Sequence, residues 1–247
     1  MPRKRYLKTH VNERRNLGKN TRNSWASFLR AIRASNPLFF ESHLKEIEQG
    51  LAFDLGRHII EIARNSKTPV SVMDLGCGIP NALLDLEKLF SKEKVNVKMV
   101  GINSFRIPNR ISDKVRVIPF HKLSEKFPSN SQDLVFSHHG FTNVLQFGGT
   151  EYIKQTLSEV LKILKPNGLF VFNVPKKREV NGKIINPIKI NFFEFKDLFT
   201  KAGFEIETEK NFEQRISIQN SSDNVGEYEE VTISGFAFVL KKPARKK

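Results

Sequence analysis

A short segment in the first third of the 247-residue chain, Asp74–Pro80 (DLGCGIP), carries the clearest chemical signal. It follows an apolar stretch typical of a buried strand and precedes a stretch with helical periodicity from Asn81. Gly76 permits a sharp turn, Gly78 permits close approach to a ligand, and the helix directs free N–H groups toward the same crevice. An acid at Asp74 suits an amine-bearing ligand better than a pyrophosphate. The alternative is that any tight strand-to-helix turn favours glycine.

A pair of histidines, His138 and His139, follows a second apolar stretch and is the candidate for proton transfer. One of the two is expected to point into the crevice if the strand continues that far. The alternative is that His138 forms a hydrogen bond with cofactor or backbone while His139 packs beneath Phe141. We expect no metal site, because the other histidines show no ligand spacing with this pair and cysteine clusters are absent. The single cysteine, Cys77, excludes an internal disulfide and leaves no cysteine nucleophile outside the glycine turn.

The elements that must position these groups alternate between strand and helix, which predicts a mostly parallel sheet covered on both faces. Strands are expected near residues 70–75, 97–102, 115–119, 134–137, 169–174, 204–208 and 231–240. Helices are expected near residues 82–90, 152–164 and 193–202, with long polar connections at 175–190 and 215–230. Two helices should precede the sheet, at 21–36 and at 38–64, the second with a break at Gly50. We therefore expect a basic arm (1–20), a helical extension or lid (21–68), one α/β domain (69–240) and a basic tail (241–247).

The net charge of +15 is concentrated at the two ends of the chain. Residues 1–35 carry ten Lys or Arg against one acid, and residues 241–247 carry five and no acid, so the remainder is almost neutral. The basic ends are candidates for contact with nucleic acid or an anionic membrane, with a solubilising tail as the alternative. The lack of a long apolar segment predicts no membrane span, and the single cysteine predicts a reducing, cytoplasmic setting.

Five segments in order resemble the class I S-adenosylmethionine-dependent methyltransferases, from about Phe53 to Leu240. They are the glycine turn, MVGINS at 99–104, SQDLVFS at 131–137, VLKILKPNGLFV at 160–171 and FKDLFTKAGF at 195–204. The resemblance implies a doubly wound sheet of seven strands whose last strand is antiparallel, with S-adenosylmethionine over the carboxyl ends of the first strands. It implies methyl transfer to an O or N acceptor. Small-molecule, protein and RNA acceptors all remain open.

The resemblance also assigns roles to individual positions. Asp74, Gly76 and Gly78 would line the methionine end of the cofactor, with Pro80 at the start of the helix. Asn103 would meet the ribose. The remaining assignments are Ser104 and Phe105 beside the adenine, His121 with Lys122 at the adenine amine, and Ser137 with His138 beneath the sulfonium.

Three of these positions depart from the family pattern. Pro80 stands where a third glycine is usual, Asn103 replaces a carboxylate, and His121 replaces an acid. The loss of charge-assisted hydrogen bonds at Asn103 implies weaker binding of the ribose. The alternative function is therefore a catalytically weak or inactive binding module built on this fold.

Overall fold

The computed structural model describes residues 42–78, 80–104, 113–141, 144, 149–180, 183–185, 192–219 and 228–244. The predicted arm at 1–20, the predicted helix at 21–36 and Phe105 lie outside the described residues. Two helices precede the sheet, α2 (His43–Leu51) and α3 (Leu55–Asn65). The predicted break at Gly50 lies one residue later, because α2 ends at Leu51 and is capped by Ala52, whose φ of 46° is left-handed and whose N–H bonds back to Gln49 and Glu48.

The sheet is built from β1 (Val70–Leu75), β2 (Val97–Asn103), β3 (Val115–Val117), β4 (Gln132–Ser137), β5 (Leu164–Val180), β7 (Glu205–Gln219) and β8 (Tyr228–Lys241). Their order across the sheet is β3-β2-β1-β4-β5-β8-β7, and a short β6 (Lys183–Ile185) pairs with β5. The first five strands are parallel, and β8 is antiparallel to both of its neighbours. This arrangement confirms the predicted mostly parallel, doubly wound sheet.

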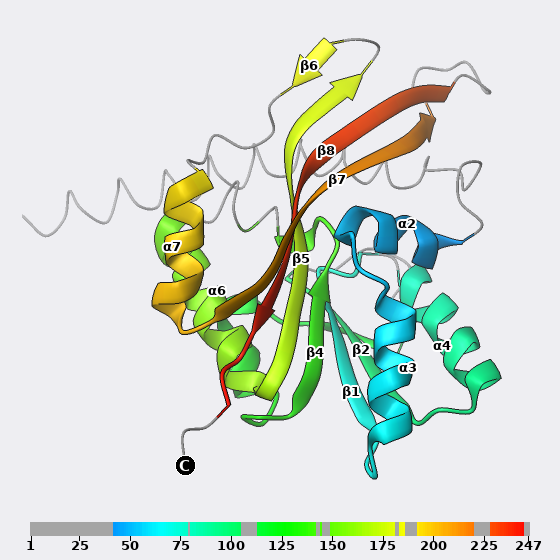
Figure 1. The fold of residues 1–247 in the computed structure, drawn as a ribbon, viewed down its shortest axis with the longest axis vertical. Helices are drawn as coiled ribbons and strands as arrows, with labels where there is room; N and C mark the ends of the chain where they lie inside the picture. Colours follow the sequence, from blue (N-terminus) through cyan, green and yellow to red (C-terminus); the bar gives the residue numbers. More distant parts are fainter. Residues whose placement is uncertain are drawn as a thin grey trace, which may run out of the picture.

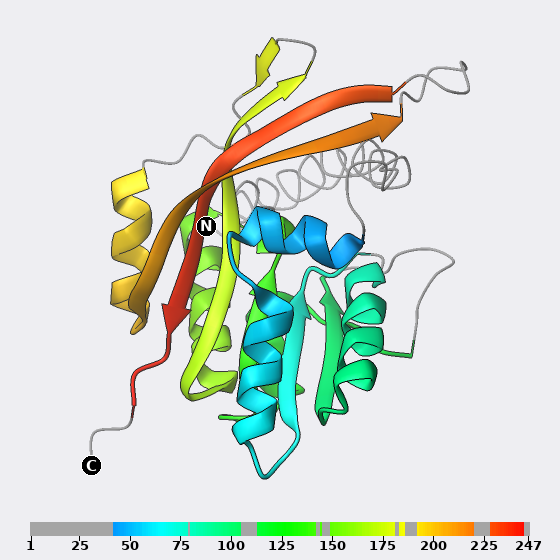
Figure 2. The ribbon, with the colours of Figure 1, turned by 45° about the vertical axis from the view of Figure 1, so that its right-hand side comes forward.

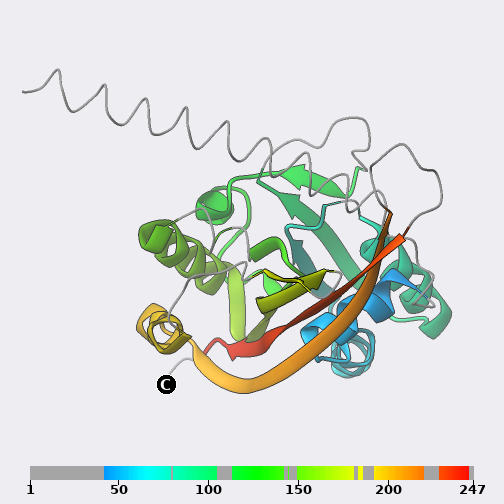
Figure 3. The same ribbon diagram turned by 90° about the horizontal axis from the view of Figure 1, so that it is seen from above.

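Helices cover both faces of this sheet (Figures 1 and 3). The helices α2, α3 and α4 (Asn81–Glu93) bury their apolar side chains against one face, in a cluster that includes Ile59, Leu86 and Val72. The helices α6 (Gly149–Ile163) and α7 (Phe192–Ala202) bury theirs on the other face, together with the 3-10 helix η2 (Phe120–Glu125). The carboxyl ends of β1, β2 and β4 therefore remain at one edge, between two helical layers.

Three strands are much longer than the sequence predicts. Residues 175–180, 183–185, 215–219 and 228–230, which fall in the predicted polar connections, are strand, and β5, β7 and β8 run well beyond the other strands (Figures 1 and 2). β7 and β8 pair continuously from Glu205↔Lys241 to Gln219↔Tyr228, apart from one register shift. Polar composition misleads here because cross-strand pairing, and not intrinsic preference alone, decides strand length.

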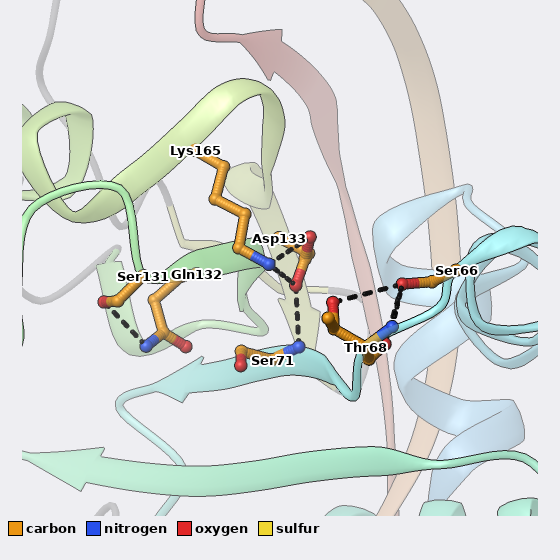
Figure 4. Close-up of polar contacts among 7 residues, drawn as sticks. All are labelled: Ser66, Thr68, Ser71, Ser131, Gln132, Asp133 and Lys165. Carbon is orange, nitrogen blue, oxygen red and sulfur yellow. Dashed lines mark hydrogen bonds and ion pairs between the residues drawn. The ribbon is translucent and has the colours of Figure 1, made fainter.

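A partly buried ion pair fixes the register of the central strands at the edge of the sheet opposite the glycine turn (Figure 4). Asp133 of β4 accepts from the backbone N–H of Ser71 in β1 at 2.8 Å, and Lys165 of β5 donates to both of its oxygens at 2.7 and 2.8 Å. The acid that opens β4 thus joins three strands through one side chain. Its position at the amino ends of β1 and β4 assigns it to the scaffold and not to the chemistry.

The first two bases of the predicted tail are part of the fold. Lys241 ends β8 and pairs with Glu207 of β7 at 2.9 Å. Lys242 donates to the carbonyls of Leu161 and Leu164 at 2.8 and 2.7 Å, at the carboxyl end of α6. A lysine at this position satisfies carbonyls that the helix itself leaves open.

Candidate functional site

The glycine turn joins β1 to α4 through two left-handed residues, Gly76 with φ 86° and Gly78 with φ 54°. A Cβ atom on Gly76 would lie 2.5 Å from the Cα atom of Gly140, so that position excludes any side chain on steric grounds as well as by φ. A Cβ atom on Gly78 would meet no atom of the described residues within 4 Å. The turn is therefore closed on the side of Gly76 and open beside Gly78, where a ligand can approach the backbone.

The end of β2 holds the turn through its last two residues. The carbonyl of Ile102 accepts from the N–H groups of Gly76 and Cys77 at 2.7 and 3.2 Å. The side chain of Asn103 accepts from the Gly78 N–H at 2.9 Å and donates to the Gly78 carbonyl at 3.1 Å. Asn103 is 4% exposed, and both polar atoms of its amide are engaged by the same residue. Burial also raises the pKa of the Cys77 thiol, which keeps it protonated.

Asp74 is buried at the end of β1, and no hydrogen bond or ion pair joins its carboxyl to another described residue. Burial raises the pKa of this carboxyl to about 8. A buried carboxyl without a partner is costly to a folded protein, and an amine placed beside it would supply both a donor and a compensating charge. The open turn and the orphaned acid together fit the amine-bearing end of the cofactor that the sequence implies.

Pro80 and Ser104 flank the turn. Pro80 caps α4 with φ −78°, and its carbonyl accepts from the N–H of Leu84 at 3.1 Å, so a proline is accommodated at the position where the missing N–H costs least. Ser104 follows β2 directly and is half-buried. Their contacts with a cofactor stay predictions.

Ser137, at the end of β4, is fully buried and joins two backbone segments. Its hydroxyl donates to the carbonyl of Leu75 at 2.5 Å and accepts from the N–H of Phe141 at 2.7 Å. These two bonds tie the ends of β1 and β4 together and bring Gly140 against Gly76. The predicted position of Ser137 beneath the sulfonium stays a prediction.

The rings of the two histidines that follow β4 are in contact, with centroids 4.0 Å apart and planes tilted by 41°. His138 Nε2 lies 3.3 Å from the side-chain oxygen of Gln214, and the backbone N–H of His139 donates to the side-chain oxygen of Asn173 at 2.9 Å. Burial lowers the pKa of His138 well below its usual value and lowers the pKa of His139 to about 4. Both rings are therefore neutral at pH 7. The described partner of the His138 ring is thus a side chain of β7, and the alternative that His138 bonds the cofactor stays a prediction.

The helix α2 lies over this edge of the sheet and touches both sides of the site. At its start, His43 Nε2 lies 3.2 Å from the side-chain amide of Asn81, the first residue of α4. Near its end, Gly50 packs directly on the ring of His138, leaving no room for a Cβ atom. In between, the carbonyl of Glu46 accepts from the Gln214 amide at 2.9 Å. In the described part of the predicted extension, α3 packs on β1 while α2 lies over the carboxyl edge, and the role of a lid stays a prediction.

Sequence reasoning missed Gln214, Gly50 and Asn173 as parts of this site. One signal was present for Gln214, which alternates with the buried Phe212 and is itself fully buried, so it is a polar residue on an apolar face of β7. A buried amide requires partners, and that requirement identifies it. Nothing local marks Gly50 or Asn173.

His121 and Lys122 lie in η2, which follows β3. The His121 ring packs edge-on against Tyr152 of α6 at 5.1 Å, and Lys122 pairs with Glu125 at 3.2 Å. His121 lines a pocket of about 320 Å³ together with α6 residues, and none of the described residues lining it belongs to the glycine turn. The predicted contact of these two residues with adenine stays a prediction.

Two further statements hold for the described residues alone, on metal ligands and on membrane-spanning helices. No group of three or more His, Cys, Asp and Glu side chains is arranged to hold a metal ion. None of the described helices is long and apolar enough to cross a membrane.

Several solved structures superpose on this chain. A proposed sarcosine dimethylglycine methyltransferase from Galdieria sulphuraria superposes with a TM-score of 0.50 at 14% identity, over 77% of this chain and 84% of that one. A protein from work on the conversion of a disulfide bond into a thioacetal group during echinomycin biosynthesis gives 0.50 at 12% identity, over 77% and 82%. A methyltransferase from Methanosarcina mazei gives 0.47 at 16% identity, over 75% and 98%.

The two likenesses with a TM-score of 0.50 show the fold alone. None of the curated protein sequences compared with this chain matches it significantly. Residues 73–172, from the glycine turn to the first part of β5, match the family model for a methyltransferase domain. The ordered motifs and the sheet agree with this match, which assigns a methyltransferase domain to residues 73–172.

Proposed function

We propose that the methionine end of S-adenosylmethionine lies above Gly76–Gly78 with its amine at Asp74, and that the acceptor is an oxygen or nitrogen held beneath α2. The observation that carries the proposal is the buried Asp74 carboxyl, which bonds none of the described side chains and lies at the start of an open turn. The amine would lower the pKa of this carboxyl from about 8 and so release a proton on binding near pH 7.

S-adenosylmethionine supplies an electrophilic methyl group, which leaves alignment, exclusion of water and removal of a proton to the protein. Alignment is the task of the turn, which β2 fixes through Ile102 and Asn103. Exclusion of water is the task of α2, which rests on Asn81 at one end and on His138 at the other.

His138 is the candidate acceptor of the proton. Its neutral ring donates through Nε2 to Gln214, so the lone pair resides on Nδ1. A neutral imidazole with a low pKa is a weak base, and it suits an acceptor that loses its proton only as the new bond forms. This chemistry favours an O–H or N–H acceptor. Replacing His138 with Gln should lower turnover while leaving cofactor affinity unchanged; unaltered turnover with every acceptor would refute the role.

Calorimetry with S-adenosylmethionine and S-adenosylhomocysteine tests the cofactor site. Asp74→Asn should weaken both by roughly ten- to a hundredfold, the value of a hydrogen bond between charged groups. Asp197→Asn, which makes the same change on the exposed face of α7, is the matched control and should bind normally. The absence of binding by the wild-type chain at millimolar cofactor would overturn the proposal.

The basic ends support a second, narrower proposal, that they attract an anionic partner. Lys241 and Lys242 are engaged in the fold, so any such contact depends on the bases of residues 3–33 and 245–247. Deleting residues 1–20 should then weaken binding to RNA, DNA or anionic vesicles and reduce its salt dependence. An unchanged salt slope would leave the ends as solubilising segments only.

A further inference from the structure

The side chain of Asn103 is placed where the family resemblance implies a ribose ligand, yet its two polar atoms bond the backbone of Gly78. The oxygen accepts from the Gly78 N–H at 2.9 Å, and the nitrogen donates to the Gly78 carbonyl at 3.1 Å. The backbone of Asn103 is fixed as well, because its carbonyl accepts from the N–H of Ile118 beside β3 at 2.8 Å. The amide thus connects a rigid strand end to the most open residue of the turn.

We infer that Asn103 is a latch that presets the Gly78 peptide for the cofactor, and that it is a positioning residue and not the ribose ligand. The inference rests on the proposed cofactor site above Gly78. It gives a physical reason for the departure from the family pattern at this position, since the latch requires one donor and one acceptor on the same planar group.

A carboxylate cannot perform this task. It can accept from the Gly78 N–H, but it has no proton to donate to the Gly78 carbonyl and would repel that oxygen. Asn103 is 4% exposed, so water does not readily replace the missing donor. At the left-handed φ of Gly78, the peptide orientation is set by these contacts and not by a side chain of its own. An amide at 103 and the open glycine at 78 therefore form one unit.

The two roles of Asn103, as a latch or as a ribose ligand, predict opposite changes in cofactor affinity for one substitution. If Asn103 bonded the ribose hydroxyls, Asn103→Asp would bind S-adenosylhomocysteine more tightly, because charge-assisted hydrogen bonds are the stronger ones. If Asn103 is a latch, the same substitution should weaken binding by about tenfold, since the turn loses one bond and gains a repulsion. Calorimetry decides between them. Equal or tighter binding by Asn103→Asp overturns the inference.

Asn96→Asp is the matched control. Asn96 precedes β2 at the opposite edge of the sheet and is exposed, so it receives the same change of charge without touching the turn. Its affinity for S-adenosylhomocysteine should equal that of the wild type. Asn103→Ser, which removes the latch without adding charge, should also weaken binding and covers the case in which the aspartate variant fails to fold.

Hydrogen exchange in the ligand-free protein tests the latch independently of the cofactor. The Gly78 amide should exchange faster in Asn103→Asp and Asn103→Ser than in Asn96→Asp, and unchanged exchange overturns the latch. Failure of the wild type to bind S-adenosylhomocysteine, with accelerated exchange in the variants, would instead overturn the proposed cofactor site and retain the latch.

Lowering the pH should reverse the defect of Asn103→Asp if the latch exists, whereas a general structural defect would not be reversed. A protonated carboxyl has one donor and one acceptor, like the amide, so the exchange and melting defects of Asn103→Asp should shrink as the pH falls, relative to wild type at each pH. Asp74 and Cys77 titrate in both proteins, and their contributions cancel in this comparison. A defect that stays constant or grows on acidification contradicts the inference.

Discussion

Gln214 presents its side-chain oxygen to Nε2 of His138 at 3.3 Å because its nitrogen is already committed to the carbonyl of Glu46 at 2.9 Å. An amide oxygen only accepts, so the neutral histidine must carry its proton on Nε2 and its lone pair on Nδ1. One buried amide of β7 thus sets the tautomer of the candidate base and holds α2 in place.

Gln214→Glu should move the pH dependence of methyl transfer. A carboxylate beside His138 stabilises the imidazolium and raises its pKa, so the acid limb of the rate profile should shift to higher pH. The measurement is single-turnover transfer from pH 5 to 8. Gln155→Glu on the exposed side of α6 is the control. A profile that coincides with the wild type would show that His138 takes no part in proton transfer.

His139→Asn should make the protein less sensitive to acid. Burial holds the folded-state pKa of His139 at about 4, whereas the unfolded chain takes up a proton near pH 6.5, so the folded state loses stability between those two values. The loss assigned to this residue is roughly 3 kcal/mol between pH 6.5 and 4. Asparagine tolerates the left-handed φ of 60° at this position. Urea unfolding of both proteins at several pH values tests this, and parallel curves would contradict it.

Asp74→Asn should stabilise the ligand-free protein while it weakens cofactor binding. The folded-state pKa of Asp74 is about 8 and the unfolded value is near 4, so the unfolded chain loses its proton first and the folded state becomes less stable as the pH rises through that window. The advantage of the variant should grow by up to roughly 4 kcal/mol from pH 5 to 8. Thermal unfolding across this range measures it. If the stability difference between Asp74→Asn and the wild type does not change with pH, ionisation of the Asp74 carboxyl does not destabilise the folded protein.

Gly50→Ala should separate α2 from His138. Alanine normally stabilises a helix by about 1 kcal/mol relative to glycine, but here its Cβ atom would overlap the His138 ring, so the expected sign is reversed. The acceptor KM should rise more than the Kd for S-adenosylhomocysteine. In a His138→Ala background the ring is gone and the glycine substitution should become neutral or stabilising. An additive double-mutant cycle would refute the contact.

The sequence predicts the central elements well because their signal is local. β1 falls at the predicted residues, and α4, α6 and α7 fall within three residues of theirs, since apolar periodicity and the prolines and glycines at their ends act over short distances. The length of β5, β7 and β8 depends on pairing between strands far apart in the chain, which no window of residues contains.

In the candidate site too, the sequence predicts the local features and misses the contacts between distant residues. The turn, Asp74 and the two histidines are visible from residue type and position, and Pro80 behaves as its chemistry predicts. The bond from Asn103 to Gly78 spans 25 positions and that from His138 to Gln214 spans 76, so both depend on how the finished sheet brings strand ends together. The resemblance predicts that Asn103 meets the ribose, which stays a prediction, and it could not supply the bond to Gly78.

The position of β8 between β5 and β7 has a consequence for biosynthesis. β7 pairs with no described strand other than β8, although it is made first, so residues 205–219 leave the ribosome before residues 228–241 can receive them. At the usual rate of translation, about 5–20 residues per second, this long strand waits for about a second or more with its backbone unpaired on both sides. The newborn chain is therefore exposed to misassociation through β7 in this interval, and chaperones that recognise open strands should bind it then.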